Sequence, residues 1–395
     1  MRFGWIRLHF LLVYAVAGAY MPYLPVYLGT DLGLPDAQIG WVSGVYGLSV
    51  LVAPLLFTSL ADRSLSGRTV VVLCSLLACL ALLGLGLADS FLAVLPLSFT
   101  FSLFYTPQFA LLDGLAFSAI AAAPERAPPY ERIRVWGSLG FMLPAFALFF
   151  VFHATSTAGH AAILAAAISA GLAALAGLRL PNFPPVARDA GLSAFAAWHA
   201  LRGASTRVLL VAMGLLFAAI SVFYAFYGRL LVASGIDPAW VGLTVNLGVL
   251  AELPLVFAAG ALLRRFSVRA LLLFGAVSLT LRMALLAVGD PLLIVASQVL
   301  HGPAVLALYL LPPMILNHKA EPALRNSVQG LYAMLCFGVA RLLGSVAGGY
   351  AAEIELGWAF ALAAGFCLVA TACLVFGFHD PDVDIALRKN VPASP

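Results

Sequence analysis

Charged side chains are scarce in this sequence. Only 10% of its 395 residues are Asp, Glu, Lys or Arg, whereas 63% are hydrophobic. A soluble domain carries about 25% charged residues, and an aqueous fold of this size cannot hide so much apolar surface. The composition therefore excludes a soluble protein and indicates that lipid is part of its solvent.

The sequence also lacks the usual marks of metal, disulfide, enzymatic or nucleic-acid chemistry. Its five cysteines are an odd number in apolar stretches, without metal-ligand spacing, so we expect neither a disulfide framework nor a metal site. We find no His-x-x-x-His, no Gly-x-Ser-x-Gly and, within the apolar runs, no clustered acids, which argues against an intramembrane enzyme. Basic residues are scattered through short loops and form no run, so no nucleic-acid partner is expected.

Long apolar runs recur along the whole chain. A helix needs about 20 apolar residues to cross the hydrocarbon layer. The run from Leu8 to Leu28 is too long for a signal-peptide core and has no Ala-x-Ala-like cleavage site, so we interpret it as the first span. We predict an all-α membrane protein with twelve transmembrane helices at about 7–29, 38–61, 68–88, 91–120, 133–153, 158–178, 206–230, 239–263, 269–288, 291–317, 325–350 and 356–377.

The distribution of basic residues predicts the orientation. Most of the 21 Lys and Arg residues fall in loops on one side of the twelve spans, while the opposite loops contain acids such as Asp31, Asp89 and Asp290. Basic loops stay in the cytoplasm. We therefore expect a multi-pass protein of the bacterial inner (cytoplasmic) membrane, with both termini cytoplasmic.

The chain divides into two similar halves. Its longest polar break separates six spans from six, and Gly33-Leu34-Pro35-Asp36 before the second span resembles Gly235-Ile236-Asp237-Pro238 before the eighth. Such a repeat predicts two pseudo-symmetric six-helix halves with a substrate site near the membrane midplane between them. The expected parts are an N-terminal bundle (1–180), a cytoplasmic linker (181–205), a C-terminal bundle (206–380) and a cytoplasmic tail (381–395).

Several ionisable residues lie within or at the start of the predicted spans. A charge at the bilayer centre costs about 2.5–3.5 kcal/mol, so such residues face a partner or a water-filled cavity. Two interpretations are open for each of them. The residue is either a structural partner in helix packing or in the core, or it takes part in substrate binding or proton movement. Asp113 could meet Arg134 across a tight loop, and Glu252 could be neutralised by Arg282. The set is Asp113, Arg134, Glu252, Arg282, His301 and Arg341.

Aromatic residues gather in two of the spans, and the first of these also contains prolines. Tyr20 and Tyr23 flank Pro22 in the first span, and the seventh contains Tyr224 and Tyr227. Prolines free backbone hydrogen-bonding groups, which is tolerated where neighbours or water satisfy them. These tyrosines either line a cavity or, for the first span, belong to an interfacial aromatic belt.

At these residues the sequence resembles the major facilitator superfamily. It is similar to the oligosaccharide/proton symporters of the lactose permease type and to their phenylpropionate- and nucleoside-transporter relatives. The stretch 18–25 resembles the first helix of that group, and 130–141 resembles the opening of the fifth helix in phenylpropionate-type transporters. Asp62, Arg63 and Arg68 resemble the conformational loop motif between the second and third helices.

The resemblance implies a role for each candidate. Asp113 and Arg134 match positions that hold the substrate, whereas Glu252, Arg282 and His301 match positions that link substrate binding to proton movement. Three departures stand out: Ala304 replaces a proton-carrying glutamate, Phe141 replaces a sugar-stacking tryptophan, and tyrosines near 224 and 227 replace acids of the seventh helix. The first leaves the proton carrier open, and the others argue against a galactoside.

These observations predict a secondary active transporter that works by alternating access, as a monomer in the lipid bilayer. We expect symport of protons with a small organic solute, best an aromatic carboxylate such as 3-phenylpropionate, and no cofactor besides the proton gradient. A nucleoside or sugar symporter, drug efflux and a non-transporting assembly factor or sensor stay open. Proton coupling is assigned to Glu252, His301, Arg282 and Arg341, and substrate binding to Asp113, Arg134, Phe141, Tyr20, Tyr23, Tyr224 and Tyr227.

Overall fold

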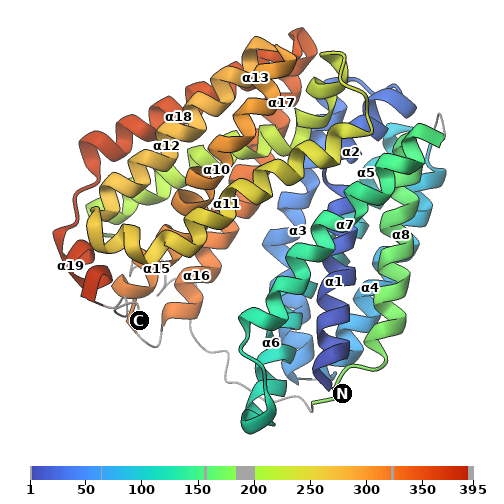
Figure 1. Ribbon diagram of the computed structural model, residues 1–395, viewed down its shortest axis with the longest axis horizontal. Helices are drawn as coiled ribbons and strands as arrows, with labels where there is room; N and C mark the ends of the chain where they lie inside the picture. Colours follow the sequence, from blue (N-terminus) through green and yellow to red (C-terminus); the bar gives the residue numbers. More distant parts are fainter. Residues whose placement is uncertain (1, 64, 155–157, 184–200, 322–323, 390–395) are drawn as a thin grey trace. The chain divides into compact units, whose positions relative to one another are not determined.

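The computed structural model describes residues 2–63, 65–154, 158–183, 201–321 and 324–389 (Figure 1). Within these ranges, eleven helical segments are long and apolar enough to cross a membrane. The second predicted span is occupied by a further helix, α3, over Asp36–Arg63. Helices thus cover all twelve predicted spans, which confirms the predicted all-α membrane fold.

The helices of the first half include two interrupted spans. The first span bends after Tyr20, and the fourth is divided at Thr106 before Pro107, because a proline has no N–H for the helix and restricts the residue before it. The elements are α1 Arg2–Tyr20, α2 Leu24–Val26, η1 Tyr27–Asp31, α3 Asp36–Arg63, α4 Gly67–Leu87, α5 Phe91–Tyr105, α6 Pro107–Ala121, η2 Pro124–Arg126, α7 Glu131–Ala154 and α8 Ala158–Gly177.

The second half repeats this pattern with more interruptions. Its tenth span changes helix type four times around Pro303 and Pro312, and its eleventh contains a π-helical segment. The elements are α10 Ala204–Ala233, α11 Trp240–Arg265, α12 Val268–Val288, α13 Pro291–Ala296, η3 Ser297–Leu300, α14 His301–Val305, η4 Leu306–Leu310, α15 Leu311–Lys319, α16 Arg325–Ala333, η6 Met334–Ala340, α17 Arg341–Ile354, α18 Leu356–Gly377 and α19 Pro381–Lys389.

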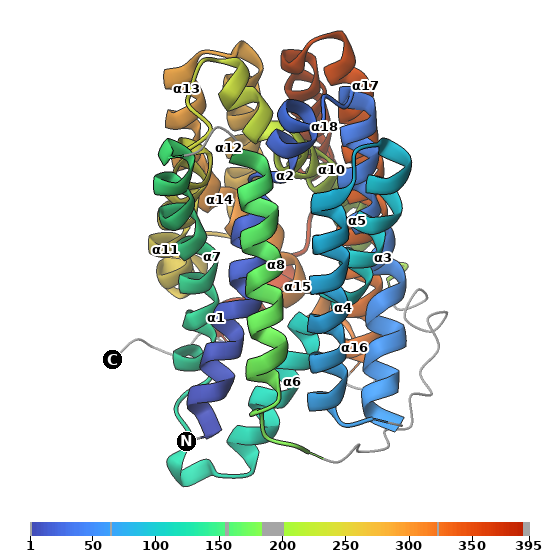
Figure 2. The same ribbon diagram turned by 90° about the vertical axis from the view of Figure 1, so that its right-hand side faces the viewer.

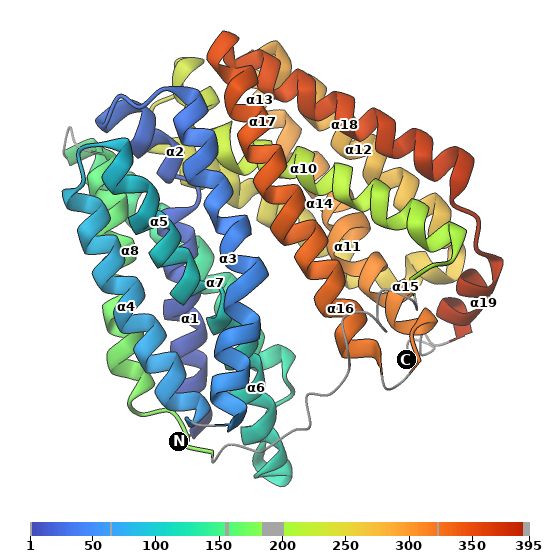
Figure 3. The same ribbon diagram turned by 180° about the vertical axis from the view of Figure 1, so that it is seen from behind.

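Contacts between residues group the chain into two compact units. Unit 1 comprises Met1–Asp189 with Tyr227–Leu243, and unit 2 comprises Ala190–Phe226 with Thr244–Pro395. In unit 1, α1 packs against α7 and α8, and α4 lies beside α8 (Figure 2). In unit 2, α18 packs against both α12 and α17 (Figure 3). The predicted limits at 180 and 206 stay a prediction.

Small residues allow α1 and α7 to approach closely in unit 1. A side chain at Gly18 of α1 would collide with the backbone of Phe141 in α7, and one at Gly140 would collide with the backbone of Leu11. Small residues at such crossings are typical of membrane helices, which associate largely through close packing. This crossing places the opening of α7, with Arg134 and Phe141, directly against α1.

Candidate functional site

A buried polar cluster lies at the centre of unit 2. The Arg282 guanidinium is 0% exposed and donates from Nη1 to His301 Nδ1 and from Nη2 to Gln298 Oε1, each at 2.8 Å. The Phe223 ring covers it, with its centroid 4.0 Å from Cζ. The structure therefore brings together Arg282 and His301, two of the predicted proton-coupling residues.

Glu252 extends this cluster towards the surface of α11. Its Oε2 lies 3.5 Å from His301 Nε2, and its side chain is 26% exposed whereas that of His301 is 11% exposed. An arginine has only donors, so His301 Nδ1 accepts from Arg282 and the imidazole proton is assigned to Nε2, on the side of Glu252. The side chains form a continuous chain from Glu252 through His301 and Arg282 to Gln298.

The 3₁₀ segment η3 explains how one helix supplies two partners of Arg282. Side chains three residues apart eclipse one another in a 3₁₀-helix, and Gln298 and His301 have this spacing across the end of η3. Gly248 of α11 lies against both, since a Cβ there would be 2.9 Å from Gln298 Oε1 and 3.4 Å from His301 Cβ. The irregular tenth span and a glycine thus bring Glu252, one turn after Gly248, alongside His301.

Arg341 lies in unit 2 among tyrosines. It begins α17 directly after the π-helical η6, and its Cζ is 5.7 Å from the Tyr224 ring centroid. Phe217 connects Tyr309 and Phe337 in an aromatic group of the same unit, with centroids 5.3 and 4.6 Å away. Arg341 and Tyr224, both selected from the sequence, are therefore neighbours.

Unit 1 contains a second polar group, at the junction of α6 and α7. Tyr130 Oη donates to Asp113 Oδ1 at 2.6 Å, and the Arg134 guanidinium lies over the Tyr14 ring, 4.4 Å from its centroid. Asp113 takes its hydrogen bond from Tyr130, and the direct contact between Asp113 and Arg134 stays a prediction. Burial and the nearby carboxylate raise the pKa of Tyr130, which lies just before α7, so its hydroxyl remains a donor.

The remaining aromatic candidates of unit 1 are enclosed by protein. Tyr20 is 4% exposed and packs on Phe101, and Tyr23 is 0% exposed and accepts a hydrogen bond from Gly242 N at 3.1 Å. Tyr227 is 2% exposed. Their contact with substrate stays a prediction, as does that of the half-buried Phe141.

The loop motif is only partly described. Arg68 is half-buried in the first turn of α4, where the Ser66 hydroxyl caps the helix by accepting from Thr69 N at 3.3 Å. The side chains of Asp62 and Arg63 lie outside the described residues.

Sequence reasoning missed four members of these clusters: Gln298, Phe223, Tyr130 and Tyr14. Two had a usable signal, because Gln298 is a polar amide within an apolar run and Tyr130 opens the stretch that resembles phenylpropionate-type transporters. Phe223 adjoins the candidate Tyr224 in the aromatic stretch of the seventh span, whereas Tyr14 carried no signal of its own. Among the described residues, no group of three or more His, Cys, Asp or Glu side chains could hold a metal ion.

The class of protein follows from a family match over most of the chain. Residues 3–362 match the MFS_1 like family. The chain belongs to this family. As predicted, it is a major facilitator transporter, a multi-pass membrane protein that acts on small molecules and is not an enzyme.

The relatives of this MFS_1 like protein are named for different substrates. It is 23% identical over 366 residues to the nucleoside permease NupG of Escherichia coli (strain K12), covering 87% of this chain and 86% of that protein. It is 28% identical over 309 residues to the "Probable 3-phenylpropionic acid transporter" of the same organism, covering 75% and 77%. The crystal structure of the nucleoside transporter NupG matches with a TM-score of 0.85 at 20% identity, covering 95% and 98%, which shows the shared fold.

Proposed function

We propose that the protein is a proton-coupled symporter of the inner membrane in which the Glu252 carboxyl carries the proton. The chain Glu252–His301–Arg282–Gln298 supports this proposal most directly. Its outer end, Glu252, is the more exposed side chain, and its inner end is fully buried. This arrangement suits a carboxyl that exchanges a proton at the end of a hydrogen-bonded network.

His301 would position and stabilise Glu252 rather than carry the proton. A second proton on the ring would have to occupy Nδ1, which accepts the Arg282 hydrogen bond. It would also place an imidazolium against a guanidinium, a like-charge pair inside a low-dielectric region. The Nε2–H instead faces Glu252, where it stabilises the ionised carboxylate. This stabilisation ends when the carboxylate takes up its own proton. Ala304 stands at the position that resembles the proton-carrying glutamate of lactose-permease-type symporters. Since alanine cannot carry a proton, Glu252 is the acid of this cluster.

The proposed substrate is a nucleoside. The relative and the solved structure named NupG cover most of the chain, and both are named as nucleoside carriers. An aromatic carboxylate, the substrate class favoured by the sequence, is the second candidate. The Arg134 guanidinium over the Tyr14 ring offers a cation beside an aromatic face, and one relative is named for 3-phenylpropionic acid.

The proton gradient is sufficient for accumulation by alternating access. One charge moving through about 100 mV of membrane potential provides about 2.3 kcal/mol, which sustains a solute gradient of roughly forty-fold. A one-to-one symporter would therefore concentrate its solute without another energy source.

The test is transport by the purified protein in liposomes with a pH-sensitive dye inside. A nucleoside, 3-phenylpropionate and maltose are added in turn. We expect proton entry with the nucleoside, and loss of that signal in Glu252→Gln. The matched control is Glu355→Gln, an exposed acid at the start of α18, which should behave as wild type. Solute equilibration without proton entry would refute symport, and proton entry with 3-phenylpropionate alone would transfer the substrate assignment to the second candidate.

A further inference from the structure

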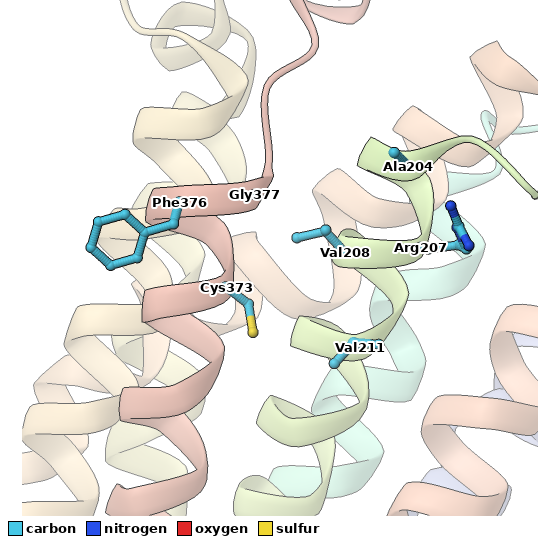
Figure 4. A pocket seen from close by; sticks show the side chains of 7 residues that line it. All are labelled: Ala204, Arg207, Val208, Val211, Cys373, Phe376 and Gly377. Atoms are coloured by element: carbon cyan, nitrogen blue, oxygen red, sulfur yellow. The ribbon is translucent and has the colours of Figure 1, made fainter.

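An apolar groove lies on unit 2 where α10 begins and α18 ends. It has a volume of about 540 Å³ and is lined by Ala204, Arg207, Val208, Val211, Cys373, Phe376 and Gly377. Figure 4 shows Val208 and Cys373 turned towards the space between the two helices, whereas Phe376 and Arg207 lie on the outer sides of their helices. Phe376 is 89% exposed and Val211 is 56% exposed, so these apolar side chains face the surroundings of the helices.

A second groove occupies the corresponding place in unit 1. It lies between the start of α1 and the end of α8, and its volume is about 360 Å³. It is lined by Trp5, Leu8, Leu12, Leu172, Leu175, Ala176 and Arg179. The Arg179 guanidinium is 5.6 Å from the Trp5 ring centroid, which holds its charge at the groove.

The two grooves share position and chemistry. Each lies between the first and the last spanning helix of its half, at the end where the first helix begins. Each has apolar walls and a single arginine near the adjoining loop, Arg207 in one and Arg179 in the other. Arg207 lies in the first turn of the first helix of its half, whereas Arg179 lies just after the last helix of its half, so each groove has one arginine at the same end but on opposite walls.

We propose that each groove binds one anionic phospholipid from the leaflet next to the basic loops, the leaflet that the charge distribution predicts to be cytoplasmic. One acyl chain would lie along the apolar walls, and the arginine would bind the headgroup phosphate. Basic pockets between transmembrane helices on the cytoplasmic side recognise anionic lipid headgroups in this way. The long arginine stem can pack on apolar surface while its guanidinium reaches the interface.

The chemistry of the grooves selects this occupant. A free phosphate would leave the apolar walls uncovered, and a zwitterionic lipid would add a cation beside the arginine. An anionic phospholipid satisfies both the apolar walls and the charge. Arg207 is exposed and lies in the first turn of α10, so no rearrangement of the helices is needed for contact.

The binding test compares lipids on the intact purified protein. Native mass spectrometry would count molecules retained from equal mixtures of phosphatidylglycerol and phosphatidylcholine with matched acyl chains. We expect two retained phosphatidylglycerol molecules. Arg207→Gln and Arg179→Gln should each lower the occupancy of one site about five-fold, since one arginine near the membrane surface contributes about that factor. Arg265→Gln, an exposed arginine on the same side and outside both grooves, is the control.

Cys373 provides an independent measurement inside the unit 2 groove. It is half-exposed and lines the groove, so a fluorophore attached to it in a Cys79→Ser background reports on the occupant. Phosphatidylglycerol with brominated acyl chains should quench this fluorophore more strongly than brominated phosphatidylcholine, and Arg207→Gln should abolish the difference. Equal quenching by both lipids, or equal retention in both arginine variants and wild type, would overturn the proposal.

Discussion

The polar clusters of the two units differ in how completely the protein encloses them. In unit 2, Arg282, Gln298 and His301 are 0%, 1% and 8% exposed and are joined by hydrogen bonds. In unit 1, Asp113 in the middle of α6 and Arg134 in the first turn of α7 are half-buried. Buried polar groups require partners, so the unit 2 cluster is rigid and suits the handling of a proton. The unit 1 cluster remains accessible, which suits contact with a solute.

The largest expected effect comes from removing the cation of the buried cluster. Arg282→Met deprives His301 Nδ1 and Gln298 Oε1 of their donor, and each buried acceptor left without one costs about 1–3 kcal/mol. We expect loss of proton-coupled accumulation together with a clear decrease in the thermal unfolding temperature in detergent. Arg265→Met, at an exposed position, should change stability by less than about 0.5 kcal/mol. Similar unfolding temperatures for the two variants would contradict the buried network.

Substitution of His301 separates positioning from proton carriage. A glutamine can accept from Arg282 and present a donor to Glu252, on the side that His301 Nε2 faces, whereas a phenylalanine can do neither. We expect His301→Gln to retain much of the substrate-driven proton entry and His301→Phe to lose at least about ten-fold. If both variants lost coupling completely while still exchanging substrate, His301 itself would be the carrier.

A smaller effect is expected where α11 approaches the cluster. Gly248→Ala places a methyl group 2.9 Å from Gln298 Oε1, which must shift and disturb its bond to Arg282. We expect a few-fold decrease in the rate of proton-coupled uptake. Gly365→Ala in α18 is the matched control, because nothing lies within 4 Å of the added atom. That control should be neutral or stabilising by about 0.5–1 kcal/mol through helix propensity; equal decreases in both variants would show that the effect is general.

The smallest effect is expected in the accessible cluster of unit 1. Tyr130→Phe removes the hydrogen bond to Asp113. A hydrogen bond to a charged acceptor contributes about 1.5–3 kcal/mol, and this one contributes less because both side chains are half-exposed. We expect substrate affinity to fall by about three- to ten-fold, as measured by equilibrium binding. In an Asp113→Ala background, where no side-chain acceptor remains for the Tyr130 hydroxyl, the same substitution should have little further effect. Because the pKa of Tyr130 is raised, the hydrogen-bond contribution should persist throughout neutral and mildly alkaline pH. Additive losses in the double variant would contradict the pairing.

The features that sequence reasoning predicted correctly are those that depend on local composition. Apolar runs bounded by Gly, Pro and charge predicted every spanning helix, because burial in lipid imposes its length requirement on each segment separately. The scarcity of ionisable residues inside the spans made Glu252, Arg282 and His301 conspicuous. Gln298 escaped notice because an uncharged amide is a much weaker signal in the same background.

The sequence alone determined the class of fold and the positions of the spanning helices, and it singled out a short set of ionisable residues inside them, since these follow from the cost of placing polar groups in lipid. Only the tertiary structure decided which partners meet. Each residue turns a helix by about 100°, so the direction of a side chain depends on interruptions such as η3 that no apolar pattern reveals. For that reason, only the packed helices show that His301 Nδ1 accepts the hydrogen bond of Arg282. They also show that Asp113 accepts a hydrogen bond from Tyr130.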